Sequence, residues 1–89
     1  MNSETIASFR KQFSAAPVAV QLKIRQAHQL RSESPQHPSL RFKKVHATLP
    51  IFSARVDLDW RAVGILKADT MIWFFVGPHG EYERLLRQL

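Results

Sequence analysis

The spacing of the apolar residues changes at His37-Pro38 in this chain of 89 residues, and that change limits most strongly how the chain can fold. Before it, apolar side chains recur every three to four residues, as on one face of a helix. After it, they alternate with polar side chains, as in strands that bury one face. We therefore expect helices followed by a sheet, the order typical of an α+β fold.

The residues before the change predict two helices. A short helix from Ser3 to Ala15 is indicated by three apolar side chains at helical spacing, Ile6, Phe9 and Phe13. A second helix should run from Pro17 to Ser34, because proline suits the first turn of a helix and two more prolines follow Ser34. Its buried side should carry Val20, Ile24, Ala27 and Leu30.

The residues after the change predict four strands, at 41–46, 51–58, 60–66 and 70–76. The last strand is apolar on both faces, as expected of a strand that is covered from both sides. A short C-terminal helix should follow it. We therefore expect residues 1–89 to form a single α+β domain, in which an N-terminal helical hairpin packs on a twisted antiparallel sheet of three to four strands.

The composition argues against several classes of protein. The chain has no cysteine, so disulfides and cysteine-based zinc sites are excluded, and its four histidines lack the spacing of a metal site. Its longest apolar run, 71–76, is far shorter than the roughly 20 residues that span a bilayer. No secretory signal is visible in Met1-Asn2-Ser3-Glu4. We expect a cytoplasmic protein with no metal, no cofactor and no membrane partner.

The basic residues are unevenly placed. Residues 10–44 hold eight cations and one acid, a net charge of +7, whereas residues 45–89 hold five of each; with Glu4, the whole chain has a net charge of +6. Such a local excess suits a nucleic acid or an acidic protein, and it equally suits a solvated surface that keeps the chain soluble. Lys43 and Lys44, next to Phe42, would contact a nucleic-acid backbone or, alternatively, protect the edge of the sheet from unwanted pairing.

Two arginines are candidates for holding a phosphodiester. Arg55 lies on the polar face of its predicted strand and Arg61 follows across a tight turn, so a hairpin would bring both to one side of the sheet. Two guanidinium groups would neutralise the charge that builds on phosphate oxygens during cleavage. The alternative is that each pairs locally, for example Arg55 with Asp57 or Asp59.

His79 and Tyr82 are candidates for proton transfer. They lie where the last strand passes into the terminal helix, and histidine is the side chain best suited to proton transfer near neutral pH. Tyr82, about one helical turn further on, would help to orient a base or would donate a proton. Alternatively, His79 caps the helix and Tyr82 packs in the core.

The order of these segments resembles that of the RelE/ParE superfamily of bacterial type II toxins, over residues 17–87. The resemblance rests on four segments taken together: Pro35-Gln36-His37-Pro38-Ser39-Leu40-Arg41-Phe42-Lys43, Ile51-Phe52-Ser53-Ala54-Arg55-Val56, Trp60-Arg61-Ala62-Val63-Gly64, and Ile72-Trp73-Phe74-Phe75-Val76-Gly77 with His79 and Tyr82. It implies a helical hairpin packed on a twisted antiparallel sheet. It also implies a cognate antitoxin that wraps the toxin and, together with it, binds the operator DNA of their shared operon.

RelE-like members of this superfamily enter the ribosomal A site and cleave mRNA. The resemblance implies that Arg55 and Arg61 match cations of their central strands, and that His79 and Tyr82 match their His/Tyr element. Ser53 stands where some relatives have lysine, so fewer charges surround the phosphate here. The residues that would bind RNA are Lys43, Lys44, Arg41, Lys23 and Arg25.

The superfamily offers alternatives to this function. ParE-like members poison DNA gyrase and lack the nuclease residues, and an inactive homologue would serve only as antitoxin partner and co-repressor. The favoured hypothesis is a ribosome-dependent mRNA endonuclease toxin that needs no metal or cofactor. Its partners would be the antitoxin, the ribosome and mRNA, with operator DNA contacted only through the antitoxin complex.

Overall fold

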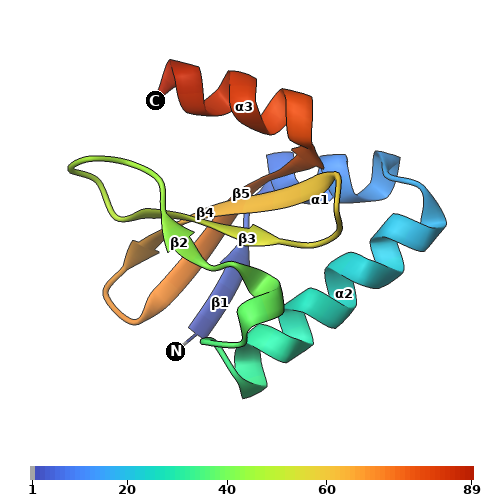
Figure 1. Cartoon of the computed structure of the whole chain (residues 1–89), viewed down its shortest axis with the longest axis horizontal. Helices are drawn as coiled ribbons and strands as arrows, with labels where there is room; N and C mark the ends of the chain where they lie inside the picture. The colour runs from blue at the N-terminus through green and yellow to red at the C-terminus, as the bar shows by residue number, and fades with distance from the viewer. Residues whose placement is uncertain (1) are drawn as a thin grey trace.

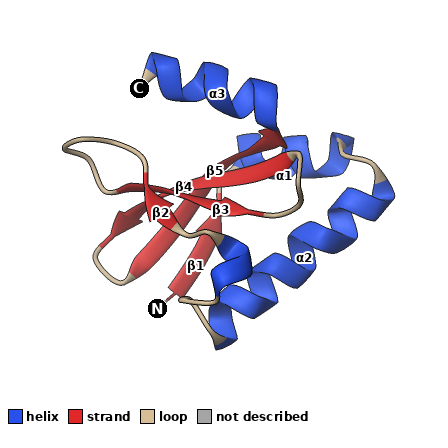
Figure 2. Ribbon diagram, viewed as in Figure 1, coloured by secondary structure: helices blue, strands red, loops and turns tan. Residues whose placement is uncertain are grey.

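The computed structural model describes residues 2–89, which form helices and strands in an α+β arrangement, as predicted (Figure 1, Figure 2). None of the helices in this part of the chain is long and apolar enough to cross a membrane. In chain order the elements are β1 Asn2–Thr5, α1 Ala7–Ala15, α2 Val18–Glu33, the short 3-10 helix η1 Pro38–Leu40, β2 Lys43–Lys44, β3 Ile51–Arg55, β4 Trp60–Lys67, β5 Thr70–Pro78 and α3 His79–Gln88.

The strands form one mixed sheet in the order β1-β5-β4-β3-β2. The strands from β2 to β5 pair antiparallel, as predicted. β1 pairs parallel with β5, with Asn2 opposite Thr70 and Thr5 opposite Trp73. The expected antiparallel sheet of three to four strands is therefore corrected to a mixed sheet of five strands.

β1 occupies residues that were expected in the first helix, and α1 begins at Ala7 instead of Ser3. The strand is exposed along its whole length and contains no apolar residue, so hydrophobic spacing carries no sign of it. Its pairing is made by the backbone, beginning with the N–H of Asn2, which donates to the carbonyl of Asp69 at 2.8 Å. The pairing covers an edge of β5 that would otherwise be open.

The sheet lies between helices (Figure 2) and separates two apolar layers. On one face, α1 and α2 cover a cluster of buried side chains, Phe9, Ile24, Ala54, Ala62, Met71, Trp73 and Val76. On the other face, α3 covers a smaller cluster, Ile51, Val63, Phe75 and Tyr82. β5 contributes to both clusters, which confirms that this strand is covered from both sides.

Two strands are shorter than their sequence patterns predict. Arg41 ends η1 in the left-handed conformation, with φ 43°, and only two residues beyond it pair as β2. β3 ends at Arg55, before the predicted end at Leu58, because the chain turns there. The N–H of Val56 donates across this turn to the carbonyl of Trp60 at 3.0 Å.

A buried arginine joins α2 to the sheet. Arg31 is only 6% exposed, and its guanidinium carbon lies 4.9 Å from the ring centre of Phe42 and 5.4 Å from that of Trp73. Aromatic faces attract a cation through the ring quadrupole. Arg31 therefore connects α2 with β5 and with the segment that leads into β2, in a place where the sequence predicted only apolar contacts.

Gln21 ties the two N-terminal helices together. Its side-chain Nε2 donates to carbonyl oxygens at the end of α1, those of Phe13 at 3.1 Å, Ser14 at 3.3 Å and Ala16 at 3.1 Å. The last carbonyls of a helix lack partners within the helix, so this amide supplies them from α2.

We expect Gln21→Ala to lower the free energy of unfolding by about 1–2 kcal/mol, because carbonyls that Gln21 now satisfies would lose their donor. Urea denaturation followed by circular dichroism measures the change. Gln26→Ala removes the same side chain from an exposed position of the same helix and should cost less than about 0.5 kcal/mol. Equal losses in the two variants would contradict the capping role.

Candidate functional site

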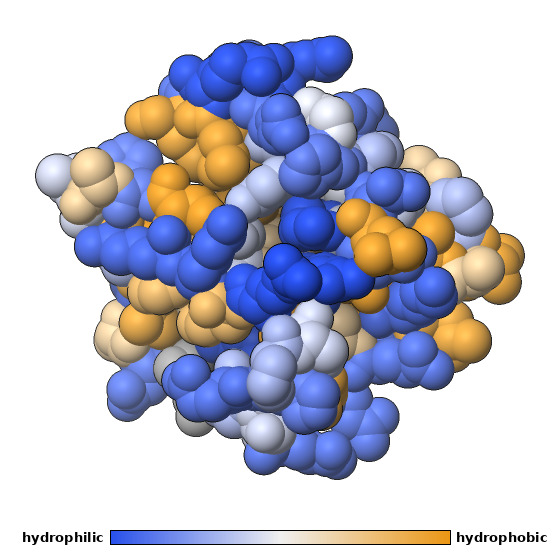
Figure 3. Space-filling view, in the orientation of Figure 1, coloured by the Kyte–Doolittle hydropathy of each residue, from blue (hydrophilic) through white to orange (hydrophobic). Residues whose placement is uncertain are grey.

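The candidate residues on the strands are brought together by the β2-β3-β4 ladder. Lys43 in β2 lies opposite Ser53 in β3, and Arg55 in β3 lies opposite Arg61 in β4. The prediction that a hairpin brings Arg55 and Arg61 to one side of the sheet is thereby confirmed. Ser53 contacts Tyr82 of α3, which assigns this row of residues to the α3 side of the sheet. Figure 3 shows hydrophilic side chains across the middle of one face of the molecule, between apolar patches.

The two arginines make different contacts. Nη1 of Arg61 donates to three carbonyl oxygens of the turn, those of Asp57 at 2.7 Å, Leu58 at 3.2 Å and Trp60 at 3.0 Å. Arg61 therefore holds the turn between β3 and β4 in place. Arg55 instead lines a groove between the end of β3 and α2.

The carboxylate in this turn pairs with α2. Oδ2 of Asp57 lies 3.2 Å from Nζ of Lys23, and the N–H of Leu58 donates to Oδ1 of Asp57 at 2.6 Å. The hydrogen bond from Leu58 and the contact with Lys23 hold the pKa of Asp57 below its ordinary value. Lys23, which was predicted to bind RNA, is thus engaged within the protein, although its side chain remains 49% exposed.

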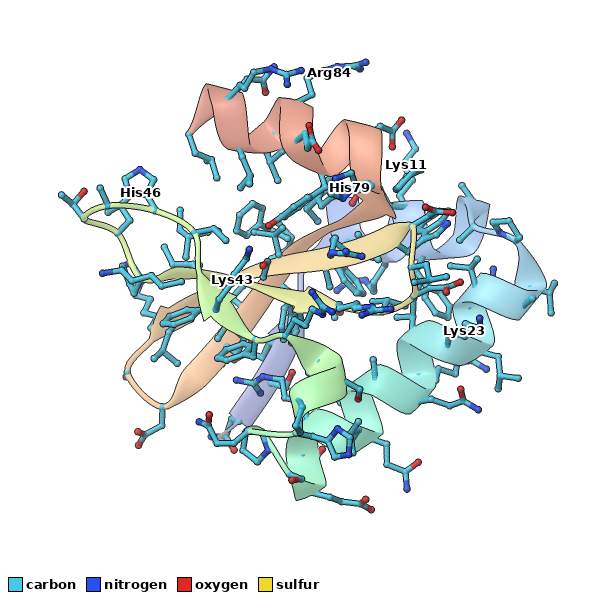
Figure 4. The ribbon with its side chains drawn as sticks, in the orientation of Figure 1. Lys11, Lys23, Lys43, His46, His79 and Arg84 are labelled. Carbon is cyan, nitrogen blue, oxygen red and sulfur yellow. The ribbon has the colours of Figure 1, made fainter. Side chains whose placement is uncertain are left out.

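His79 begins α3 directly after β5. Its backbone N–H donates to the carbonyl of Asp59 at 2.6 Å, which fixes the start of the helix against the β3-β4 turn. Its Nε2 lies 2.5 Å from Oε1 of Glu83, and its side chain is 48% exposed (Figure 4). The imidazole is accessible to a ligand while a carboxylate holds one of its nitrogens. The sequence reasoning did not single out Glu83, although a spacing of four residues in a helix signals such a pair.

Tyr82 lies beneath the surface. It is 5% exposed, and its hydroxyl donates to Oγ of Ser53, itself 2% exposed, at 3.2 Å. The centres of the Tyr82 and His79 rings are 5.9 Å apart. This position matches the alternative in which Tyr82 packs in the core, and it suits a residue that positions α3 and β3 rather than one that touches a bound chain.

The other basic residues lie on more than one face of the molecule. Lys44 follows Lys43 in β2, so their side chains leave the sheet on opposite faces. Arg25 lies over the ring of Phe13, 5.2 Å from its centre, between α2 and α1. Arg84 adds an exposed cation on α3 that the sequence reasoning did not single out (Figure 4).

The described residues contain no group of three or more His, Asp or Glu side chains placed to hold a metal ion. The site offers Lys43 and Arg61 together with the paired side chains of His79 and Glu83, and Arg55 lies in the same row of strand residues, next to the groove beside α2. Such a set can bind a phosphodiester and exchange a proton with it.

Acid should weaken the wild-type fold more than it weakens Asp57→Asn. Because the folded state lowers the pKa of Asp57 below its ordinary 3.8, the ionised carboxylate stabilises the fold at higher pH and loses that effect as the pH falls. We expect the free energy of unfolding of the variant, from urea titrations, to change less between about pH 5 and 3. Parallel curves for Asp57→Asn and wild type would refute this linkage.

The Tyr82 hydroxyl and Ser53 should be energetically coupled, because each would leave the other without its buried partner. We expect Tyr82→Phe and Ser53→Ala each to lower the free energy of unfolding by about 1 kcal/mol, and the double variant to cost less than their sum. Thermal and urea denaturation of the four proteins measure this cycle. Strictly additive losses would mean that the hydrogen bond carries no net energy.

No protein-family model matches the chain, and no curated protein matches its sequence. Solved structures do match it. YafQ from E. coli strain BL21(DE3) has a TM-score of 0.74 at 15% identity, with 91% of this chain and 96% of YafQ covered. RelE in the RelB-RelE antitoxin-toxin complex from Methanococcus jannaschii scores 0.73 at 16% identity, covering 91% and 95%. A toxin from Helicobacter pylori scores 0.64 at 21% identity, covering 91% and 97%. The chain therefore has the fold of the RelE and YafQ toxins.

Proposed function

We propose that this chain is the toxin of a type II toxin-antitoxin system and cleaves mRNA on the ribosome without a metal. The observation that carries the proposal is the fold, which is shared with YafQ and RelE over nine tenths of each chain. RelE and YafQ have been solved in complexes with the antitoxins RelB and DinJ. By analogy, this chain would have a cognate antitoxin and would reach operator DNA only through it.

The arrangement of charges on the α3 side of the sheet supports a nuclease site there. Lys43 and Arg55 project from neighbouring strands of the ladder, and half-exposed His79 lies at the end of β5. A phosphodiester that binds between them would face cations on the strands and an imidazole on the helix. Arg61 would act chiefly by holding the β3-β4 turn, whose Asp59 carbonyl in turn anchors His79.

The reaction proposed is an internal transfer within RNA. The ribose 2′-hydroxyl attacks the adjacent phosphorus and expels the 5′-oxygen, which leaves a 2′,3′-cyclic phosphate and a free 5′-hydroxyl. His79 supplies the proton that the leaving 5′-oxygen needs, with Glu83 holding its ring through Nε2. Arg55 stabilises the negative charge that accumulates on the phosphorane oxygens. Because ribosomes and mRNA are its targets, the protein would act in the cytoplasm.

A second candidate, inhibition of DNA gyrase without nuclease activity, is favoured by two observations. Tyr82 is buried, and a nitrogen of Arg61 is engaged with the turn, so the set of groups free to act on RNA is smaller than the resemblance implies. Expression that induces the SOS response and cleaves DNA, with mRNA left intact, would establish this alternative.

We expect His79→Ala to slow mRNA cleavage at least about 100-fold, because general acid catalysis typically contributes that much. Primer extension on mRNA from a purified translation system measures the cleavage. His28→Ala removes an exposed histidine from α2 and should cleave at the wild-type rate. Both variants should keep the wild-type melting temperature. When expressed in cells, His79→Ala should relieve the growth arrest. Wild-type cleavage by His79→Ala would rule out this site.

A further inference from the structure

A groove opens on the face of the sheet opposite His79, between α1 and α2. It has a volume of about 470 Å³. Its floor reaches core residues of the sheet, among them Trp73 at 4% exposure, and its walls include Phe9 and Phe13 of α1 and Ile24 of α2. The surface inside it is therefore mostly apolar.

The groove exists because small side chains meet there. Ala54 in β3 and Ala62 in β4 are opposite each other in the register and lie on this face of the sheet, 4% and 7% exposed. Ala27 of α2 faces the same space. Alanine at all three positions leaves unfilled space between the two helices and the sheet, although protein interiors normally pack without such gaps.

The ionisable side chains that line this groove are all basic. Arg10 of α1 and Arg25, His28 and Arg31 of α2 line it, and no Asp or Glu is among its described lining residues. Burial lowers the pKa of Arg31 from its ordinary value. A negative group placed in the groove would be attracted by the basic side chains that line it.

We propose that this groove is a binding site for a small organic anion with an apolar body, such as an aromatic sulfonate or an alkyl carboxylate. The volume lies within the range of about 300–1,000 Å³ that small-molecule pockets occupy, and apolar walls with a few placed polar groups are typical of them. The apolar body enters above Ala54 and Ala62, and the anionic group stays beside Arg25 and Arg31.

A small molecule fits the groove better than a docked protein surface does. The space narrows onto side chains that are less than 9% exposed, Ile24, Ala54, Ala62 and Trp73, so its occupant must reach into the core. The site lies on the other side of the sheet from His79. It is therefore separate from the proposed nuclease site, and binding in the groove does not depend on the nuclease function.

The first test is titration of the full chain with 8-anilinonaphthalene-1-sulfonate, an aromatic sulfonate that fluoresces in apolar sites. We expect saturable binding at one site, and displacement by decanoate. Ala62→Leu should weaken binding at least about tenfold because the added atoms fill the groove, whereas Ala19→Leu, on the exposed side of α2, should leave it unchanged. Arg25→Gln should weaken binding several-fold, and Arg84→Gln on α3 should not.

A second measurement on the unaltered protein keeps the test valid if Ala62→Leu fails to fold. The chain has two tryptophans, and Trp73 lines the groove whereas Trp60 is not among its lining residues. In proton-nitrogen NMR spectra, decanoate should shift the indole resonance of Trp73 and leave that of Trp60 in place. The proposal would be overturned if decanoate shifted the two indole resonances equally, or if Ala62→Leu and Ala19→Leu bound the dye equally. It would also be overturned if an acidic amphipathic peptide displaced the dye and decanoate did not.

Discussion

The rest of the structure depends on the burial of β5, which is paired along both edges and covered on both faces. β1 joins one edge in parallel and β4 joins the other antiparallel. Trp73 packs in the layer under α1 and α2, and Phe75 packs in the layer under α3. Because β5 passes into α3 without a loop, the packing of both layers fixes where His79 stands. A functional group on such a rigid support keeps its geometry with little loss of entropy on binding.

The sequence predicted well those elements that bury apolar side chains in a regular pattern. α2 begins and ends within a residue of the expected limits, and the doubly apolar pattern of residues 70–76 indicated a strand with two covered faces. β1 escaped prediction because backbone hydrogen bonds hold it and its side chains are all exposed. The burial of Arg31 also escaped, because a cation enters a core only where tertiary structure supplies partners such as the rings of Phe42 and Trp73.

The sequence predicted which residues of the site lie close together. It did not predict what each of them does. Two strands joined by a tight turn were enough to place Arg55 opposite Arg61. What Arg61 does depends on the carbonyls that the turn presents to it, and the position of Tyr82 depends on Ser53 in a strand 29 residues away. Long-range contacts of this kind have no counterpart in local spacing, so the residues alone left open whether Tyr82 acts in catalysis or packs in the core.

The two faces of the sheet thus differ in chemistry, with cations and an exposed imidazole on the α3 side and an apolar groove rimmed by arginines on the other. We propose that the α3 side of the sheet cleaves mRNA on the ribosome. Identifying the new ends of mRNA after the purified protein acts on translating ribosomes tests it most directly. We expect a 5′-hydroxyl, labelled by polynucleotide kinase without prior phosphatase treatment, and a 2′,3′-cyclic phosphate, formed only on ribosome-bound mRNA. Intact mRNA together with gyrase-dependent DNA breaks would contradict it.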